Sequence, residues 1–204
     1  MGQDPGSGPL EQVTLLRAGD RSDAIYDEWA DTYESDLLDR FGYSGHRIAA
    51  DALLEHLTDP GAAIVDYGCG TGLVGELLGA AGCRIVDGVD YSARMLDVCR
   101  AKACYRSTIE ADLTRPLDIP DRTYDAMICA GVMGAGHLEP EHFAELFRTV
   151  RPGGPIVMFG NATPYVDEGY AARFAALDWT IGRTEIVNYM AALNRPGALV
   201  IGRR

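Results

Sequence analysis

Ile64-Val-Asp-Tyr-Gly-Cys-Gly-Thr-Gly-Leu-Val-Gly75 is the stretch of sequence that decides the fold of this chain. It begins with apolar residues that end at Asp66, as a buried strand does, and three alternate glycines follow at Gly68, Gly70 and Gly72. Glycines let a turn bend tightly and approach a ligand, and the helix expected next has unpaired N–H groups at its start. The stretch therefore predicts a strand, a ligand-binding turn and a helix.

The chain around this stretch alternates between apolar strands and helices. Strands are expected at residues 62–66, 83–90, 106–110, 124–130 and 155–160, with helices at 73–81, 93–103 and 141–150 between them. This alternation is typical of a parallel sheet covered by helices on both faces. Near the end, apolar segments at 184–190 and 198–204 flank Asn194-Arg-Pro-Gly197, which predicts an antiparallel hairpin closed by a Pro-Gly turn. We expect an α/β, Rossmann-like sheet whose last strand is reversed.

The length of 204 residues fits one domain. We expect a flexible tail at residues 1–21 and a single domain at residues 22–204, divided into an N-terminal helical lid at 22–60 and a Rossmann-like core at 61–204. Helices at 23–40 and 48–57 would form the lid. The first ten residues have neither a basic nor an apolar signal region, so no signal peptide is expected.

Composition excludes several classes of partner. Eighteen Lys and Arg residues against thirty Asp and Glu residues give a formal net charge of −12, which disfavours binding to nucleic acids and to anionic membranes. No apolar run approaches the ~20 residues of a membrane span. The five cysteines form no C-x-x-C pair, which argues against a disulfide framework or a zinc cluster and fits a reducing cytoplasm. The charge and cysteine pattern thus favour a cytoplasmic protein with no nucleic-acid or membrane partner.

Three acidic residues end three successive predicted strands. Asp90 follows Asp66 by 24 residues, and Asp112 follows Asp90 by 22 residues. Ligands of open α/β sheets bind at the carboxyl ends of the strands, where Asp90 can accept hydrogen bonds from a ribose and Asp112 from an adenine amine. Asp66, near the glycines, would repel a pyrophosphate but attract a cationic amino group. The three acids therefore fit a nucleoside that carries an amino acid.

These motifs resemble the class I S-adenosylmethionine-dependent methyltransferases, within them the type-11 branch and especially the Williams–Beuren-region methyltransferase-like proteins. The resemblance also rests on the segment from Ile25 to Tyr33 and on Arg151-Pro-Gly-Gly154. It implies a seven-stranded sheet with an antiparallel last strand and S-adenosylmethionine as cofactor. The residues predicted to bind this cofactor are Tyr26, Trp29, Tyr33, Asp66, Gly68, Cys69, Gly70, Gly72, Asp90, Tyr91, Met95, Asp112, Leu113, Cys129 and Ala130.

The methyl acceptor is expected to be a small molecule with an oxygen, nitrogen or sulfur nucleophile. Only about twenty residues separate the fifth and sixth strands, which leaves no inserted substrate domain. His137, in the loop after the fourth strand, is the candidate catalytic base, with Tyr33 as the second candidate. That strand end carries neither an Asn/Asp-Pro-Pro-Tyr motif nor an acidic ligand for Mg²⁺, so a DNA adenine substrate is disfavoured and no metal is expected.

Other interpretations stay open at this point. The chain could bind S-adenosylmethionine or its demethylated product without transferring a methyl group. A nicotinamide-dependent oxidoreductase is disfavoured by Asp66 and by the reversed last strand. The aromatic residues Tyr26, Trp29 and Tyr33 could equally form a buried helix face or a ligand wall, and His137 could be a capping or exposed residue. The sequence does not indicate an oligomeric state.

Overall fold

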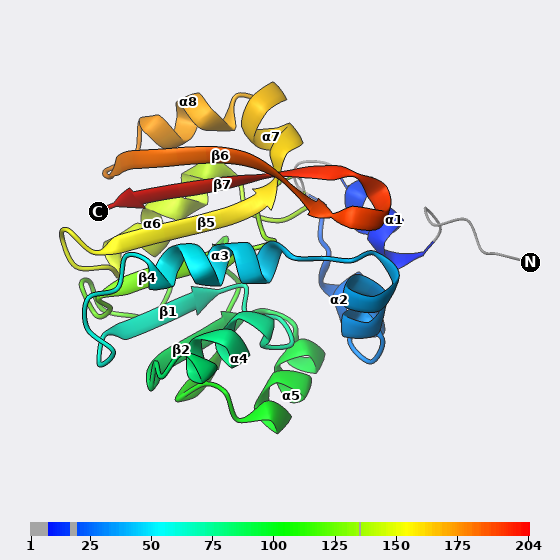
Figure 1. Cartoon of the computed structure of the whole chain (residues 1–204), viewed down its shortest axis with the longest axis horizontal. Coiled ribbons are helices and arrows are strands. Elements are labelled where there is room, and N and C mark those ends of the chain that lie inside the picture. Colours follow the sequence, from blue (N-terminus) through cyan, green and yellow to red (C-terminus); the bar gives the residue numbers. More distant parts are fainter. Residues whose placement is uncertain (1–7, 17–19, 135) are drawn as a thin grey trace, which may run out of the picture.

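The computed structural model describes residues 8–16, 20–134 and 136–204, in which seven strands form one sheet in the order β3-β2-β1-β4-β5-β7-β6 (Figure 1). The strands are β1 (Ala63–Tyr67), β2 (Ile85–Asp90), β3 (Ser107–Glu110), β4 (Ala126–Ala130), β5 (Pro155–Asn161), β6 (Thr180–Met190) and β7 (Arg195–Arg203). Strands β1 to β5 pair in parallel, and β7 is antiparallel to both β5 and β6. The predicted fold class, a mostly parallel Rossmann-like sheet with a reversed last strand, is confirmed.

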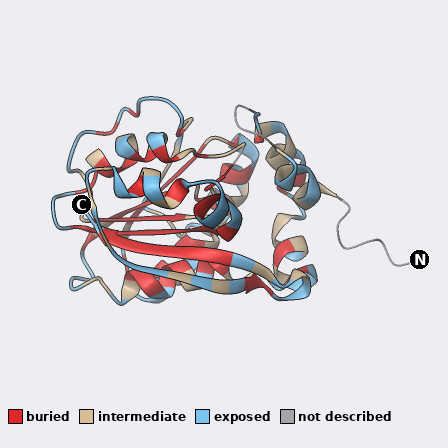
Figure 2. Cartoon of the chain, turned by 90° about the horizontal axis from the view of Figure 1, so that it is seen from above, coloured by how far each residue is buried: buried red, intermediate tan, exposed pale blue. Residues whose placement is uncertain are grey.

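Helices cover both faces of the sheet, and each face has its own core. Helices α3 (Gly45–Leu54) and α4 (Leu73–Ala80) pack on one face, and α6 (Phe143–Arg148) and α8 (Tyr170–Ala175) on the other. Strand β1 contributes side chains to both cores. Val65 and Tyr67 belong to the core that α6 covers, whereas Ile64 belongs to the core that α3 and α4 cover. Successive strand residues point to opposite faces, so a strand buried on both sides is apolar throughout. Figure 2 shows the buried strands between exposed outer helix faces.

The remaining helices lie at the strand ends or beside β2 and β3. Helix α5 (Ala93–Lys102) contacts β2 and β3. Helix α7 (Ala162–Asp167), which the sequence analysis did not predict, directly follows β5. The Asn161 side chain begins α7 by accepting a hydrogen bond of 3.1 Å from the backbone N–H of Thr163, as Asn does at helix N-termini. Short 3₁₀ turns lie at Pro140–His142 and Ala191–Leu193.

The hairpin between β6 and β7 is turned by other residues than predicted. The expected Pro-Gly turn at 194–197 is wrong, because Pro196 and Gly197 already lie in β7. The chain reverses through the 3₁₀ turn at 191–193 and through Asn194, which has a left-handed φ of 47°. Asn tolerates this conformation. Pro196 pairs with Asn188 of β6, and the pairing of β5 with β7 ends one residue away, at Gly197. The missing N–H of Pro196 therefore does not interrupt the hydrogen bonds between β5 and β7.

The N-terminal region differs most from the sequence-based expectation. Part of the expected flexible tail forms helix α1 (Pro9–Thr14), whose Leu10 and Val13 pack against the core under α3; residues 1–7 and 17–19 lie outside the described residues. The single helix expected at 23–40 is divided into α2 (Asp23–Trp29) and a π-helix at Ser35–Arg40, with a turn at 30–32 between them. Within the described residues, no helix is long and apolar enough to cross a membrane.

Candidate functional site

The glycine-rich turn connects the carboxyl end of β1 to α4 and lies beside the carboxyl end of β2. Gly68 and Gly72 have φ angles of 76° and 94°, which residues with a side chain rarely adopt. The backbone N–H of Gly68 donates to the carbonyl oxygen of Val89 over 2.7 Å, so the turn lies against the end of β2. A Cβ atom at Gly68 would lie 2.2 Å from Cγ1 of Val132, which comes from the loop after β4. The glycine thus permits the close approach of two loops at the carboxyl edge of the sheet.

Asp90 fixes the conformation of this turn. Its carboxylate accepts hydrogen bonds of 2.9 Å from the backbone N–H groups of Gly70 and Ser92. Burial raises the pKa of the carboxyl group, and these two N–H donors oppose the effect. The side chain therefore connects the glycine-rich turn to the start of α5.

Asp66 is buried beside a tyrosine that the sequence analysis did not single out. The hydroxyl of Tyr105 donates to Oδ2 of Asp66 over 2.6 Å and accepts the backbone N–H of Gly75 over 3.0 Å. The other oxygen, Oδ1, has no hydrogen-bond partner among the described residues. Burial raises the pKa of Asp66 to about 7, and the nearby Asp90 adds to this effect. Asp66 therefore leaves one unsatisfied acceptor buried beside the glycine-rich turn.

A cavity of about 370 Å³ lies over the ends of β2 and β3, and we call it the polar cavity after charged and hydroxyl side chains in its lining such as Asp23, Tyr91 and Asp112. Its lining includes five residues that the sequence analysis predicted for the site: Gly68, Tyr91, Asp112, Leu113 and His137. The Asp112 carboxylate accepts hydrogen bonds from the backbone N–H (2.9 Å) and the hydroxyl (2.6 Å) of Thr114. Although burial opposes them, these bonds and the nearby Arg21 lower the pKa of Asp112, so an ionised acceptor faces the cavity.

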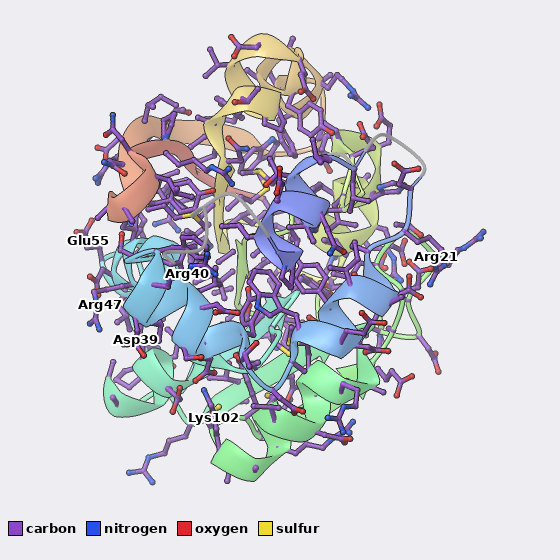
Figure 3. The ribbon with its side chains drawn as sticks, turned by 90° about the vertical axis from the view of Figure 1, so that its right-hand side faces the viewer. Arg21, Asp39, Arg40, Arg47, Glu55 and Lys102 are labelled. Atoms are coloured by element: carbon purple, nitrogen blue, oxygen red, sulfur yellow. The ribbon has the colours of Figure 1, made fainter. Side chains whose placement is uncertain are left out.

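A second cavity, of about 290 Å³, lies between the N-terminal helices and the ends of β4, β5 and β7. We call it the aromatic cavity because its walls include the rings of Tyr26, Trp29, Tyr33, Tyr43, Phe159 and Tyr189. Several rings contact each other edge to face, with centroids 4.9 Å apart for Trp29 and Tyr33 and 5.3 Å apart for Phe159 and Tyr189. Helix α1 adds Leu10 and Val13 to the lining. Figure 3 shows α1 and α2 in front of this edge of the sheet.

His137 lines both cavities. Its Nε2 atom shares a hydrogen bond of 2.9 Å with the hydroxyl of Tyr26. Burial raises the pKa of that Tyr26 hydroxyl well above its ordinary value, so it stays protonated near neutral pH. The imidazole is therefore held at the junction of the two cavities by a side chain of α2.

Hydrogen bonds connect α2 and the residue before it to the loops around the polar cavity. The Ser22 hydroxyl shares a hydrogen bond of 2.6 Å with the Tyr91 hydroxyl and donates to the carbonyl oxygen of Gly136 over 2.8 Å. The Ser92 hydroxyl donates to Asp27 over 2.5 Å. These contacts fasten Ser22 and α2 to the loops after β2 and β4.

The predicted cofactor residues are distributed unevenly over the two cavities. Tyr26, Trp29 and Tyr33 line the aromatic cavity. The residues that line neither cavity are Asp66, Cys69, Gly70, Gly72, Asp90, Met95, Cys129 and Ala130. Met95 and Cys129 are almost completely buried in the packed interior. Within residues 8–16, 20–134 and 136–204, no three His, Cys, Asp or Glu side chains are grouped so that they could hold a metal ion.

Three residues with placements of functional interest were missed by the sequence analysis. Tyr105 contacts Asp66, and Tyr43 and Arg195 line the aromatic cavity. Tyr43 lies close to the end of β4, since its hydroxyl is 3.7 Å from the position of a Cβ atom on Gly131. None of the three belongs to a motif, so no sequence signal marked them.

Comparisons with known proteins agree with this architecture. A family model described as "Methyltransferase domain" matches residues 64–154. Methyltransferase-like protein 27 of Homo sapiens is 35% identical over 137 residues, which cover 66% of this chain and 55% of that protein. Ribosomal protein L11 methyltransferase of Cupriavidus taiwanensis is 29% identical over 184 residues, which cover 85% of this chain and 60% of that protein. The chain thus spans between about half and three fifths of the length of these relatives.

Among solved structures, an S-adenosylmethionine-dependent methyltransferase from Mesorhizobium loti has the same fold. It superposes with a TM-score of 0.61 at 22% sequence identity, over 78% of this chain and 100% of that one. At this identity the comparison supports the fold and not the substrate.

Proposed function

We propose that this chain, which carries a class I S-adenosylmethionine-dependent methyltransferase domain, binds S-adenosylmethionine and transfers its methyl group to a small molecule. The proposed transfer needs no metal ion. The observation that carries the proposal is the meeting of two unlike cavities at His137. One cavity offers an ionised carboxylate and polar groups, and the other offers aromatic walls. A methyl transfer needs such a pair, because donor and acceptor must approach each other in line with water excluded.

The polar cavity would hold the nucleoside. Asp112 is placed to accept a hydrogen bond from an exocyclic amine, and Leu113 and Tyr91 can pack against a flat base. Asp90 ends β2 next to the glycine-rich turn; it lines neither cavity, but each of its oxygens accepts a backbone N–H, and a carboxylate has further lone pairs for a ribose hydroxyl. When bound, S-adenosylmethionine supplies a methyl group already activated by its sulfonium. The remaining task of the protein is therefore to orient two molecules and to exclude water.

The aromatic cavity would hold the acceptor. Its rings exclude water, and His137 at the junction can take the proton that an acceptor hydroxyl, amine or thiol releases. Tyr26 fixes the orientation of the imidazole through its bond to Nε2. Tyr33, in the same wall, stays the second candidate for proton transfer.

The size of the aromatic cavity favours a small molecule over a protein. Its volume of about 290 Å³ lies at the low end of ligand cavities, and α1 covers it with Leu10 and Val13. One relative is a ribosomal protein L11 methyltransferase, but a covered cavity of this size suits a metabolite better than a protein. The net charge of −12 argues against a nucleic-acid partner, and five free cysteines support a location in the reducing cytoplasm.

The cofactor part of the proposal is tested by titration calorimetry with S-adenosylmethionine. Asp112→Ala is expected to weaken binding at least tenfold, because a hydrogen bond to a charged group is lost. Asp118→Ala, an exposed acid of the same loop that lines neither cavity, should bind like the parent chain. Equal affinity of both variants would contradict the placement of the nucleoside.

The transfer is tested with cofactor labelled on the methyl group, incubated separately with a small-molecule extract and with a protein extract. A labelled small molecule is the expected product. Label found only in protein would contradict the choice of acceptor. Tight cofactor binding without labelled product in either extract would favour the alternative, a binding module that does not transfer the methyl group.

A further inference from the structure

Arg195 is a cationic side chain in the wall of the aromatic cavity. It begins β7, and Nη1 donates a hydrogen bond of 3.2 Å to the Thr14 hydroxyl of α1. It also lies beside the Tyr189 hydroxyl. Burial raises the pKa of this hydroxyl, and the charge of Arg195 offsets part of the increase. Within the part of the chain that the structure describes, no carboxylate forms an ion pair with Arg195. Its contacts hold the guanidinium in place without neutralising it.

Exposed arginines such as Arg47 and Arg84 also form no ion pair among the described residues, but Arg195 differs from them because it lies in a cavity wall. Other described arginines, such as Arg148 and Arg173, each pair with two carboxylates. Arg195 is only partly exposed and has apolar neighbours in Leu10 and Met190. A cation in such surroundings is costly unless it has a counter-charge, and a ligand anion can supply one.

Arg195 of β7 and Gly131 after β4 lie on opposite sides of β5, and both line the aromatic cavity. Asn161, the last residue of β5, pairs with Gly197, and Arg195 precedes Gly197 by two residues, beyond the end of β5. Gly131 follows β4 and begins the loop that carries His137. The rings of Phe159 and Tyr189 line the same cavity and contact each other edge to face. An acceptor that fills the cavity would therefore present one end to Arg195 and the other to His137.

We propose that the methyl acceptor is a small ring-bearing anion, with its negative group paired to Arg195, its ring between the aromatic walls and its nucleophile toward His137. The inference rests on the proposed function and names the substrate class of the same site. The rings favour a flat apolar body, since aromatic pairs in edge-to-face or offset geometry gain energy beyond their buried area. Aromatic faces also attract cations, but the guanidinium in the wall repels a cationic ligand. Glu168 is the one acid in the lining, and it is exposed.

Three phenols of similar length and different charge distinguish the effect of charge on binding from the effect of shape. They are the anion 3-(4-hydroxyphenyl)propionate, the neutral 4-propylphenol and the cation tyramine. Binding to the full chain, saturated with S-adenosylhomocysteine, is followed by quenching of tryptophan fluorescence, because Trp29 lines the cavity. The propionate is expected to bind at least tenfold more tightly than the other two, as for a charge-assisted hydrogen bond. Arg195→Gln should remove this preference and leave the affinity for 4-propylphenol unchanged.

Arg203→Gln is the matched control, because Arg203 lies on the same strand, is exposed and lines neither cavity. It should keep the preference for the propionate. Equal affinity for the three phenols, tightest binding of tyramine, or no binding of the propionate at millimolar concentration would overturn the inference. S-adenosylmethionine binding, measured separately by calorimetry, distinguishes failure of this inference from failure of the proposed function. If the chain binds S-adenosylmethionine but not the propionate, only the acceptor class is wrong. If the chain does not bind S-adenosylmethionine, the proposed function is wrong.

Discussion

Replacing Asp66 by Asn should make the protein more stable at alkaline pH. The Asp66 carboxyl is 1% exposed, one of its oxygens has no partner, and burial raises its pKa from 3.8 to about 7. Between these two pH values the folded chain keeps a proton that the unfolded chain releases. The contribution of Asp66 to stability is therefore complete below about pH 4 and is lost as the pH rises towards 7. The pKa difference is equivalent to about 4 kcal/mol, from ~1.4 kcal/mol for each pH unit.

The assay is urea unfolding of the parent chain and of Asp66→Asn at a series of pH values. The contributions of other titrating groups cancel in the difference between the two curves. We expect similar stabilities near pH 4 and an advantage of up to about 4 kcal/mol for the variant near pH 8. Asp118→Asn, at an exposed position, should follow the parent chain. Parallel stability curves for the parent chain and Asp66→Asn would refute the assignment of a raised pKa to this carboxyl group.

Two further predictions concern the turn and the junction of the cavities. Gly68→Ala would place a methyl group 2.2 Å from a side-chain carbon of the loop after β4, at a residue with a φ of 76°. The strained backbone and the clash should together lower the free energy of unfolding by about 1–3 kcal/mol or more. Gly153→Ala has a similar φ of 83° but open space, so urea unfolding should show a smaller loss. Tyr26→Phe removes the bond to His137 and should lower kcat at least tenfold; unchanged turnover would argue against this role, and Tyr170→Phe, outside both cavities, is the control.

The sequence predicted the backbone of the site better than its side-chain contacts. The glycine-rich turn could be located because its φ angles require glycine, and the carboxyl ends of parallel strands meet at one edge of the sheet. The spacing of the acids placed Asp66, Asp90 and Asp112 at three strand ends. It could not show that Asp112 faces a cavity while Asp66 is covered by Tyr105. That difference depends on a loop between α5 and β3 whose conformation no periodic pattern describes.

The aromatic residues of α2 and of the segment after it illustrate the same limit. Helical spacing placed Tyr26, Trp29 and Tyr33 on one face but left open whether this face was core or ligand wall. In the structure the three side chains line a cavity, and Trp29 is also almost completely buried, with Nε1 donating to Asp36 over 2.8 Å. Core and wall are therefore not exclusive alternatives here. A pattern of apolar residues predicts burial, but it cannot tell a packed surface from one that encloses a ligand.

The sequence did not identify Arg195 as a residue of the site for a further reason. The hairpin was predicted to turn at residues 194–197, which would have put Arg195 at the tip of an exposed loop. Because the chain reverses at 191–193 instead, Arg195 becomes the first residue of β7 and lies against α1. A displacement of a few residues in one turn thus moves a charge from a loop tip into the wall of a cavity. Composition and spacing fix such turns only approximately, so the chemistry of an acceptor site at a hairpin end has to be derived from the structure.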